Sequence, residues 1–225
     1  MVKLRAIFSK SKESIYLSQI DMMGIFEKSF KRANIPFEYT KLPNSRPNIV
    51  FATQIEIGIE SMGDIFEIVL IEKLPITYVI RELNKYLPAS ITILSAEYIN
   101  LQEESIVSRV YASIYTIEIC YTNEMIINKS IKDIEDLKKY YNAKMYEYLS
   151  QEFLLVIKKS EERMERIDIK PYIYDYSFLF DGKLQLTVQT TSEFKLNPDY
   201  LMIGFNEYIS NEVQYIIRRE KILFK

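Results

Sequence analysis

The order of hydrophobic patterns in the first half of the chain constrains its fold most. Residues 3–10 alternate apolar and polar side chains, which is typical of a strand with one buried face. A helix follows, with Phe26 and Phe30 in its apolar stripe. The later predicted elements are strand-like pieces at 37–41 and 48–57, a strand at 64–72, a helix from Pro75 to Leu87 and a strand at 91–99. This order predicts a ferredoxin-like (split βαβ) unit as an N-terminal domain over residues 1–102.

A similar order of patterns begins again further along the chain. Asp181 and Gly182 form a strong hairpin signal between strands at 174–180 and 183–190. The other predicted elements are strands at 109–121, 153–158, 163–169 and 214–224, a helix at 133–149 and a helix opened by Asn197-Pro198-Asp199. We therefore expect a second ferredoxin-like unit with an added β-hairpin over residues 109–225, which makes the fold class α+β.

Two scarce residue types limit the chemistry of this chain. The sequence has no histidine and a single cysteine, Cys120. It therefore cannot form an intrachain disulfide, a three-thiolate iron–sulfur site, a zinc site built on thiolates or imidazoles, or a histidine general base. We expect no metal and no cofactor, and a protein that is more readily a binding protein than an enzyme. Cys120 itself is expected to be a small buried residue of a strand.

The sequence also shows no hydrophobic segment that would direct the chain to a membrane. No apolar stretch of signal-peptide length follows Lys3 and Arg5, and no apolar run approaches the roughly 20 residues of a membrane helix. The net charge is −2, so the charge of the whole chain does not attract nucleic acid. We expect a cytoplasmic protein.

One segment is nevertheless basic. Between residues 28 and 48 the only acidic side chain is Glu38, and the basic side chains are Lys28, Lys31, Arg32, Lys41 and Arg46. Two interpretations are open: solvated positions on a helix and its following loop, or contacts to the phosphates of RNA. Arg5 and Lys10 lie near the start of the same helix and could extend such a phosphate-binding face.

Other candidate positions also have a structural and a functional interpretation. Ser18 and Asp21 have the spacing of a capping box, which explains both residues without a catalytic role. Asp168 with Lys170-Pro171 fits the end of a strand as well as a site. The prolines of the loop from Asn44 to Pro47 either stiffen the chain or hold its arginine where it can bind an anion.

Several short motifs resemble one known family. They are Ser18 with Asp21, Arg32 to Pro36, Asn44 to Pro47, Gly58 to Ser61, Ile167 to Ile173, and Leu196 to Asp199. Together they resemble the radical-SAM-associated domain-of-unknown-function family over essentially the whole chain, as a standalone member without the radical SAM domain. The family-motif positions singled out are Ser18, Gln19, Asp21, Asn44, Pro47, Gly58, Ser61, Asp168, Lys170 and Pro171. Gln19 stands where the family has a histidine, so a centre built on that histidine is absent here.

The resemblance implies an accessory role linked to RNA. Family members are commonly encoded beside, or fused to, a radical SAM protein, often near a ribonuclease and large-subunit ribosomal protein genes. The implied function is a non-catalytic accessory protein that binds RNA or a ribosomal component and acts with a separate radical SAM protein. Two alternatives stay open: a protein-binding module without RNA, and a less favoured histidine-free RNA-processing enzyme that uses lysine, tyrosine and arginine.

Overall fold

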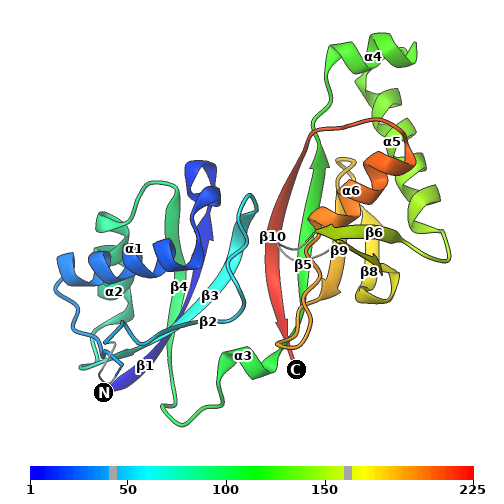
Figure 1. Ribbon diagram of the computed structural model, residues 1–225. Coiled ribbons are helices and arrows are strands. Elements are labelled where there is room, and N and C mark those ends of the chain that lie inside the picture. Colours follow the sequence, from blue (N-terminus) through cyan, green and yellow to red (C-terminus); the bar gives the residue numbers. More distant parts are fainter. Residues whose placement is uncertain (41–44, 160–163) are drawn as a thin grey trace. The chain divides into compact units, whose positions relative to one another are not determined.

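The computed structural model describes residues 1–40, 45–159 and 164–225. These residues form ten strands and six α-helices in a mixed α+β fold whose strand pairs are mostly antiparallel (Figure 1). The chain divides into two units: unit 1 is residues 1–112, 190–193 and 218–225, and unit 2 is residues 113–189 and 194–217. Each unit is therefore assembled from segments that are separate in the sequence.

Unit 1 is built around three neighbouring strands in the order β4-β1-β3, with β2 also paired to β3. Its elements are β1 (Val2–Lys10), α1 (Gln19–Arg32), β2 (Ile49–Phe51), β3 (Glu60–Leu70), α2 (Ile76–Tyr86), β4 (Ile91–Ile99) and the short α3 (Ile106–Arg109). β1 runs antiparallel to β3 and β4, and β2 runs antiparallel to β3. β1, α1, α2 and β4 confirm the sequence prediction, but residues 37–39 form only isolated bridges, the predicted strand at 48–57 is limited to β2, and β3 begins four residues before the predicted strand at 64–72.

The alternation in β1 produces the core of unit 1. Leu4, Ala6 and Phe8 are fully buried, as expected for every second residue of a strand with one face inside. Phe26 of α1 packs against Phe8 and Phe66 with ring centroids 5.1 and 4.5 Å apart. Both α1 and α2 contribute to this core, and Figure 1 shows them on the same side of the strands. Burying each phenylalanine stabilises the fold by roughly 1.5–3 kcal/mol.

The last part of β10 (Tyr215–Phe224) belongs to unit 1. It runs parallel to the start of β3, with Arg218 opposite Glu60 and Arg219 opposite Ser61. A Cβ atom at Gly63 would lie 2.4 Å from the carbonyl oxygen of Glu220. Glycine is therefore the residue that lets β3 and β10 approach at this position.

Unit 2 has a main set of strands in the order β10-β5-β9-β8 and a separate two-stranded sheet of β6 and β7. Its elements are β5 (Val110–Ile119), α4 (Asn123–Lys129), α5 (Ile134–Leu149), β6 (Leu155–Lys159), β7 (Met164–Asp168), β8 (Ile173–Phe178), β9 (Leu184–Gln189) and α6 (Asp199–Tyr208). The predicted turn at Gly182 is confirmed, with a φ of +85°. The hairpin that lies outside the main set of strands is β6–β7.

Two sequence expectations about unit 2 need correction. Cys120 follows the end of β5 and is partly exposed, not buried within a strand. Burial is still the larger of the two causes that raise the pKa of its thiol, followed by the charge of Glu118. The short helix α4 was not predicted, because its polar sequence has too few turns to show an apolar stripe. No helix in the described part of the chain is long and apolar enough to cross a membrane.

Candidate functional site

The start of α1 is held by the predicted capping box. The amide of Asp21 donates to the Ser18 hydroxyl at 3.3 Å, and the Ser18 amide donates back to the Asp21 carboxylate at 3.0 Å. The hydroxyl and amide of Ser18 hold the pKa of Asp21 below its usual value. Gln19 accepts a hydrogen bond from the amide of Ile55 at 3.4 Å. Capping thus accounts for Ser18 and Asp21, and Gln19 ties the helix to the segment before β3.

The predicted basic segment is only partly available at the surface of unit 1. Lys28 and Arg32 are exposed one turn apart on α1, and neither has an ion-pair partner among the described residues. Lys31 instead bonds the Glu27 carboxylate at 2.6 Å and lies over the Tyr39 ring, and the bond to Glu27 raises its pKa. Arg46 is exposed, and its amide donates to the hydroxyl of Thr40 at 3.0 Å.

Of three other predicted positions in this segment, two lie outside the described residues, and the third, Pro47, contributes to the structure of unit 1. Lys41 and Asn44 are the positions that fall outside the described ranges. Pro47 is buried and forms a bridge with Tyr39, whose hydroxyl donates to Glu27 of α1 at 2.9 Å. Tyr39 therefore connects the chain around Arg46 to the basic helix.

Arg5 is engaged within unit 1. Its guanidinium donates to the Glu67 carboxylate at 2.7 Å and to Glu103 at 2.9 Å. Glu67 is 2 % exposed and also pairs with Lys3 at 2.7 Å. Arg5 therefore neutralises buried and half-buried carboxylates on the sheet face that carries Glu67.

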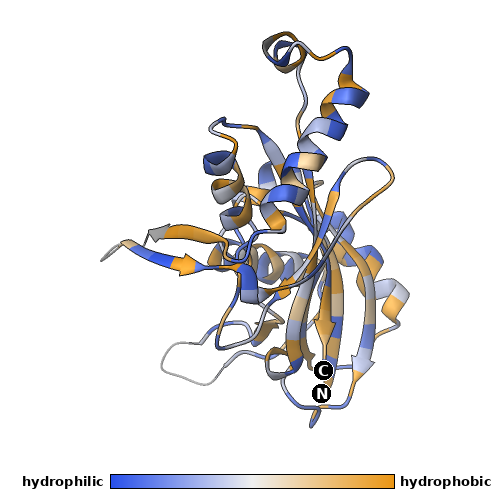
Figure 2. Ribbon diagram, turned by 90° about the vertical axis from the view of Figure 1, so that its right-hand side faces the viewer, coloured by the Kyte–Doolittle hydropathy of each residue, from blue (hydrophilic) through white to orange (hydrophobic). Residues whose placement is uncertain are grey.

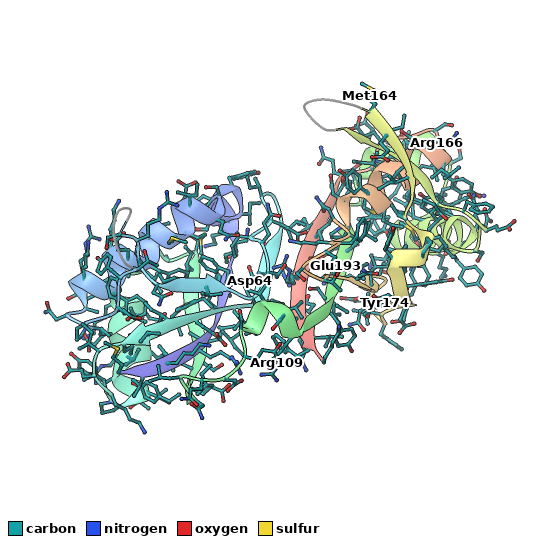
Figure 3. The ribbon with its side chains drawn as sticks, turned by 60° about the horizontal axis from the view of Figure 1, so that its bottom comes forward. Asp64, Arg109, Met164, Arg166, Tyr174 and Glu193 are labelled. Atoms are coloured by element: carbon teal, nitrogen blue, oxygen red, sulfur yellow. The ribbon has the colours of Figure 1, made fainter. Side chains whose placement is uncertain are left out.

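Lys10 belongs to a buried cluster of charges, which we call the buried charge cluster: Lys10, Glu56, Asp64 and Arg219. Lys10 and Arg219 are each 1 % exposed and Asp64 is 2 % exposed. The Arg219 guanidinium donates to Asp64 at 2.5 Å and to Glu56 at 2.6 Å, and the Lys10 ammonium donates to the Glu56 carbonyl oxygen. Figure 3 labels Asp64 on β3. Two cations and two carboxylates are thus balanced inside unit 1.

Burial determines the electrostatics of Lys10. Removal from water lowers the pKa of its ammonium, the charge of Arg219 lowers it further, and Asp64 and Glu56 act in the opposite direction. The net effect is a lowered pKa. The ammonium is thus less basic than that of an ordinary lysine.

Two of the family-motif positions lie beside the buried charge cluster. Ser61 is buried and stands opposite Lys10 in the β1–β3 register and opposite Arg219 in the β3–β10 register. Gly58 has a φ of +81°, and its amide donates to the carbonyl of Ile15 at 2.8 Å. Ser61 of this motif therefore lies between the strands that carry Lys10 and Arg219.

The sequence contains a signal for part of this site. Lys10 continues the series of every second residue that buries Leu4, Ala6 and Phe8. Asp64 is a lone charge at the start of an apolar run. A charge at a position that periodicity assigns to the core predicts a buried partner. Arg219 carries no comparable signal, because it lies in a run of charged residues.

The remaining motif positions lie in unit 2. The Asp168 carboxylate accepts the amides of Leu154 at 2.8 Å and Lys170 at 3.0 Å. The Lys170 ammonium donates to the carbonyl of Leu149, and Pro171 is in a 3-10 turn. These contacts close the base of the β6–β7 hairpin.

Each unit also contains a cavity. In unit 2 a cavity of about 460 Å³ is lined by Cys120, Tyr141 and Asn211, among others, and Asn211 donates to the Tyr141 hydroxyl at 3.3 Å. In unit 1 a cavity of about 410 Å³ is lined by residues that include Lys31 and Tyr39. Within the described ranges, no group of three or more histidine, cysteine, aspartate or glutamate side chains could hold a metal ion.

Comparison with known proteins identifies a family but no activity. A crystal structure described as an unknown protein from Galdieria sulphuraria matches with a TM-score of 0.28 and 10 % identity, over 97 % of each chain, which is too weak a likeness to support an argument. No curated protein matches the sequence. A family model described as an uncharacterized protein conserved in bacteria matches residues 3–198. The chain therefore belongs to this family of uncharacterized bacterial proteins, DUF2344.

Proposed function

We propose that this protein is a non-catalytic accessory protein that binds RNA or a ribosomal component through unit 1 and acts with a separate radical SAM protein. The observation that supports RNA binding is that Lys28 and Arg32 on α1 are exposed and have no ion-pair partner in the described part of the chain, beside the segment that presents Arg46. We call these three residues the basic face.

The contacts of each cation decide which residues belong to the basic face. Lys10 is buried and Arg5 and Lys31 are held by carboxylates of unit 1, so binding an RNA phosphate would require them to give up those partners. Lys28, Arg32 and Arg46 need no such exchange. When such cations neutralise RNA phosphates, counterions are released from the RNA, which favours binding. An arginine can also donate two parallel hydrogen bonds to a phosphate. The pI is about 5.5, so the chain as a whole does not attract RNA, and RNA binding would be confined to this local surface.

The test begins with the tagged protein in its native cells. Affinity purification with and without ribonuclease identifies co-purifying RNA and proteins, including any radical SAM protein. The enriched RNA is then titrated with the wild type and with a variant that combines Lys28→Glu, Arg32→Glu and Arg46→Glu. We expect the variant to bind more weakly and its salt dependence to fall by about 0.7 in log–log slope for each lost contact to single-stranded RNA.

A matched variant separates a specific basic face from a general effect of charge. Lys138→Glu, Lys139→Glu and Lys144→Glu make the same change of charge on α5, in unit 2, and should leave the affinity close to that of the wild type. If the two variants lose RNA affinity equally, or if neither loses any, the basic face is not the binding surface.

A second candidate function is a protein-binding module without RNA. It is favoured by one observation: Leu155, Ile157 and Met164 on the β6–β7 hairpin are exposed. An apolar patch of this kind with polar neighbours is typical of a protein-interaction surface. A protein partner that survives ribonuclease treatment, with no RNA enriched, would favour this function over the first.

We also infer that both units have the ferredoxin-like arrangement. In unit 1 the order β4-β1-β3-β2, with antiparallel neighbours and crossovers through α1 and α2, supports this inference. In unit 2 the order β10-β5-β9-β8 supports it, with β6–β7 as the insertion. The arrangement is compatible with many functions and adds nothing to the argument for RNA.

A further inference from the structure

The β6–β7 hairpin of unit 2 has one packed face and one open face. Val156 is 1 % exposed and packs on α6, where a Cβ atom at Gly204 would come within 2.8 Å of it. The residues on either side of it, Leu155 and Ile157, are 42 % and 45 % exposed, and Met164 is 72 % exposed. Figure 2 shows hydrophobic residues along the hairpin. Because strand side chains alternate, α6 fixes the hairpin through one face and leaves the other to solvent.

On the open face, Arg166 lies next to apolar residues. Arg166 is the cross-strand neighbour of Ile157, so both side chains lie on the same face. It is exposed and has no ion-pair partner among the described residues, and Figure 3 labels it with Met164 on β7. The nearest carboxylate in the register, Asp168, already accepts two backbone amides. We call Leu155, Ile157, Met164 and Arg166 the hairpin face.

The edge of β7 next to this face has backbone groups that point outward. The amide of Ile169 donates to the carbonyl of Leu154 at 2.9 Å, in the same register as the hairpin pairs. In an antiparallel ladder such bonded pairs alternate with pairs whose N–H and C=O groups point away from each other. Met164 and Arg166 belong to the second kind. No other described strand pairs with β7, so their amides and carbonyls lie at an edge to which a strand can be added.

We propose that β7 binds an extended segment of a partner protein by strand addition, and that this segment carries a carboxylate with an apolar side chain two residues away, at the position that faces Met164. The backbone edge supplies hydrogen bonds that do not depend on the partner's sequence. Arg166 selects a carboxylate at the facing position, and Met164 selects an apolar side chain two residues away on one side of it. This inference rests on the protein-binding role described above and is independent of RNA binding.

A second copy of the chain fits this edge less well. Two β7 strands paired antiparallel about Arg166 would place two arginines directly opposite each other, which destabilises a strand pair. A register shifted by two residues would place Arg166 opposite Asp168, whose carboxylate already accepts two backbone amides of its own chain. A partner with a carboxylate at that position gains an attraction in place of this repulsion. Charge complementarity therefore favours an acidic and apolar segment of another protein.

The test uses displayed random peptides of about nine residues, the length of a long strand, selected on the full chain. We expect the recovered peptides to be enriched in a carboxylate with an apolar residue two positions away on the side that faces Met164. Their affinity should fall about tenfold or more for Arg166→Glu, less for Arg166→Gln, and not at all for Arg32→Glu, which makes the same charge change on α1. Arg166 is exposed, so these variants should fold, and thermal unfolding will verify that they do.

Hydrogen exchange distinguishes strand addition from side-chain docking. The amides of Met164 and Arg166 should exchange quickly in the free protein and slowly with a selected peptide bound, and those of α5 should not change.

A selection that yields no binder overturns the proposal. So do recovered peptides without acidic enrichment, equal binding to Arg166→Glu, or exchange rates at β7 that the peptide leaves unchanged. Self-association lost in Arg166→Glu would replace the partner segment with a second copy. Loss of RNA binding in that variant alone would point to RNA at the hairpin. Failure of the combined Lys28→Glu, Arg32→Glu and Arg46→Glu variant to affect RNA binding would refute the basic face and leave this inference intact.

Discussion

Replacing Arg219 by methionine should strongly destabilise unit 1. The side chain of Arg219 is 2 % exposed, and it neutralises Asp64 and Glu56, whose side chains are 2 % and 8 % exposed. Methionine fills similar space but leaves both carboxylates buried with only Lys10 nearby. Removing one member of a buried ion network costs about 3–5 kcal/mol, because a charge remains without compensation. At about 2–4 °C per kcal/mol for a chain of this size, the melting temperature should fall by roughly 6–20 °C.

The neighbouring residue provides a matched control. Arg218 pairs with Glu60 at 2.6 Å, but its side chain is 43 % exposed, so Arg218→Met should cost no more than about 1 kcal/mol. Adding Asp64→Asn to Arg219→Met should recover about 0.5–3 kcal/mol, since it removes one of the uncompensated charges. These comparisons use the same strand and the same substitution.

Urea unfolding gives the free energy, and amide exchange shows where it acts. Exchange in β3 and the end of β10 should accelerate in Arg219→Met, and exchange in β9 of unit 2 serves as the internal reference. If Arg219→Met costs no more than Arg218→Met, the buried charge cluster does not stabilise unit 1 and the argument from burial fails.

Three other perturbations test separate parts of the structure. Gly63→Ala should lower the stability measured by thermal unfolding by about 1–3 kcal/mol, because its Cβ would meet a β10 carbonyl at 2.4 Å. Gly24→Ala is the control, because the space around Gly24 is open, and it should not destabilise the protein. Equal effects of the two substitutions would contradict the close approach at Gly63. Ser18→Ala should cost about 1 kcal/mol through loss of the helix cap, measured by urea unfolding, and no loss would show that the cap is dispensable. Burial raises the pKa of Tyr121 to about 12. The stability that its neutral phenol provides is therefore present below pH 10 and is lost as the pH rises toward 12. In an ultraviolet titration, Tyr121→Phe should remove one tyrosine that ionises late and leave the titration of the earlier ones unchanged.

Local patterns were sufficient to predict most of the elements. The alternation of residues 3–10 became β1, and the Ser18 box became the cap of α1. Asp133, at the start of the predicted helix, caps α5 by accepting the amide of Asp136 at 3.0 Å. Each of these signals lies within a few neighbouring residues, where periodicity and capping act.

The candidate sites were harder to predict, because their partners are distant in the sequence. Arg5 and Lys10 looked like surface cations, yet the carboxylate of Glu67 and the carbonyl of Glu56 bind them inside unit 1. Arg166 gave no signal, since the edge that makes it a candidate depends on the predicted strands at 153–158 and 163–169 pairing with each other outside the main set of strands. Nonlocal pairing of this kind has no local pattern to reveal it.

The inclusion of residues 218–225 in unit 1 has a consequence for biosynthesis. Residues 1–112 leave the ribosome well before residues 218–225 are made, and at about 5–20 residues per second the interval is on the order of ten seconds. During that time Asp64 and Glu56 lack Arg219, and the first part of β3 lacks the strand that pairs with it in parallel. Unit 1 therefore cannot reach its final form until β10 has been translated, and a nascent chain stalled before β10 would be open at that edge to chaperones or to pairing with other strands.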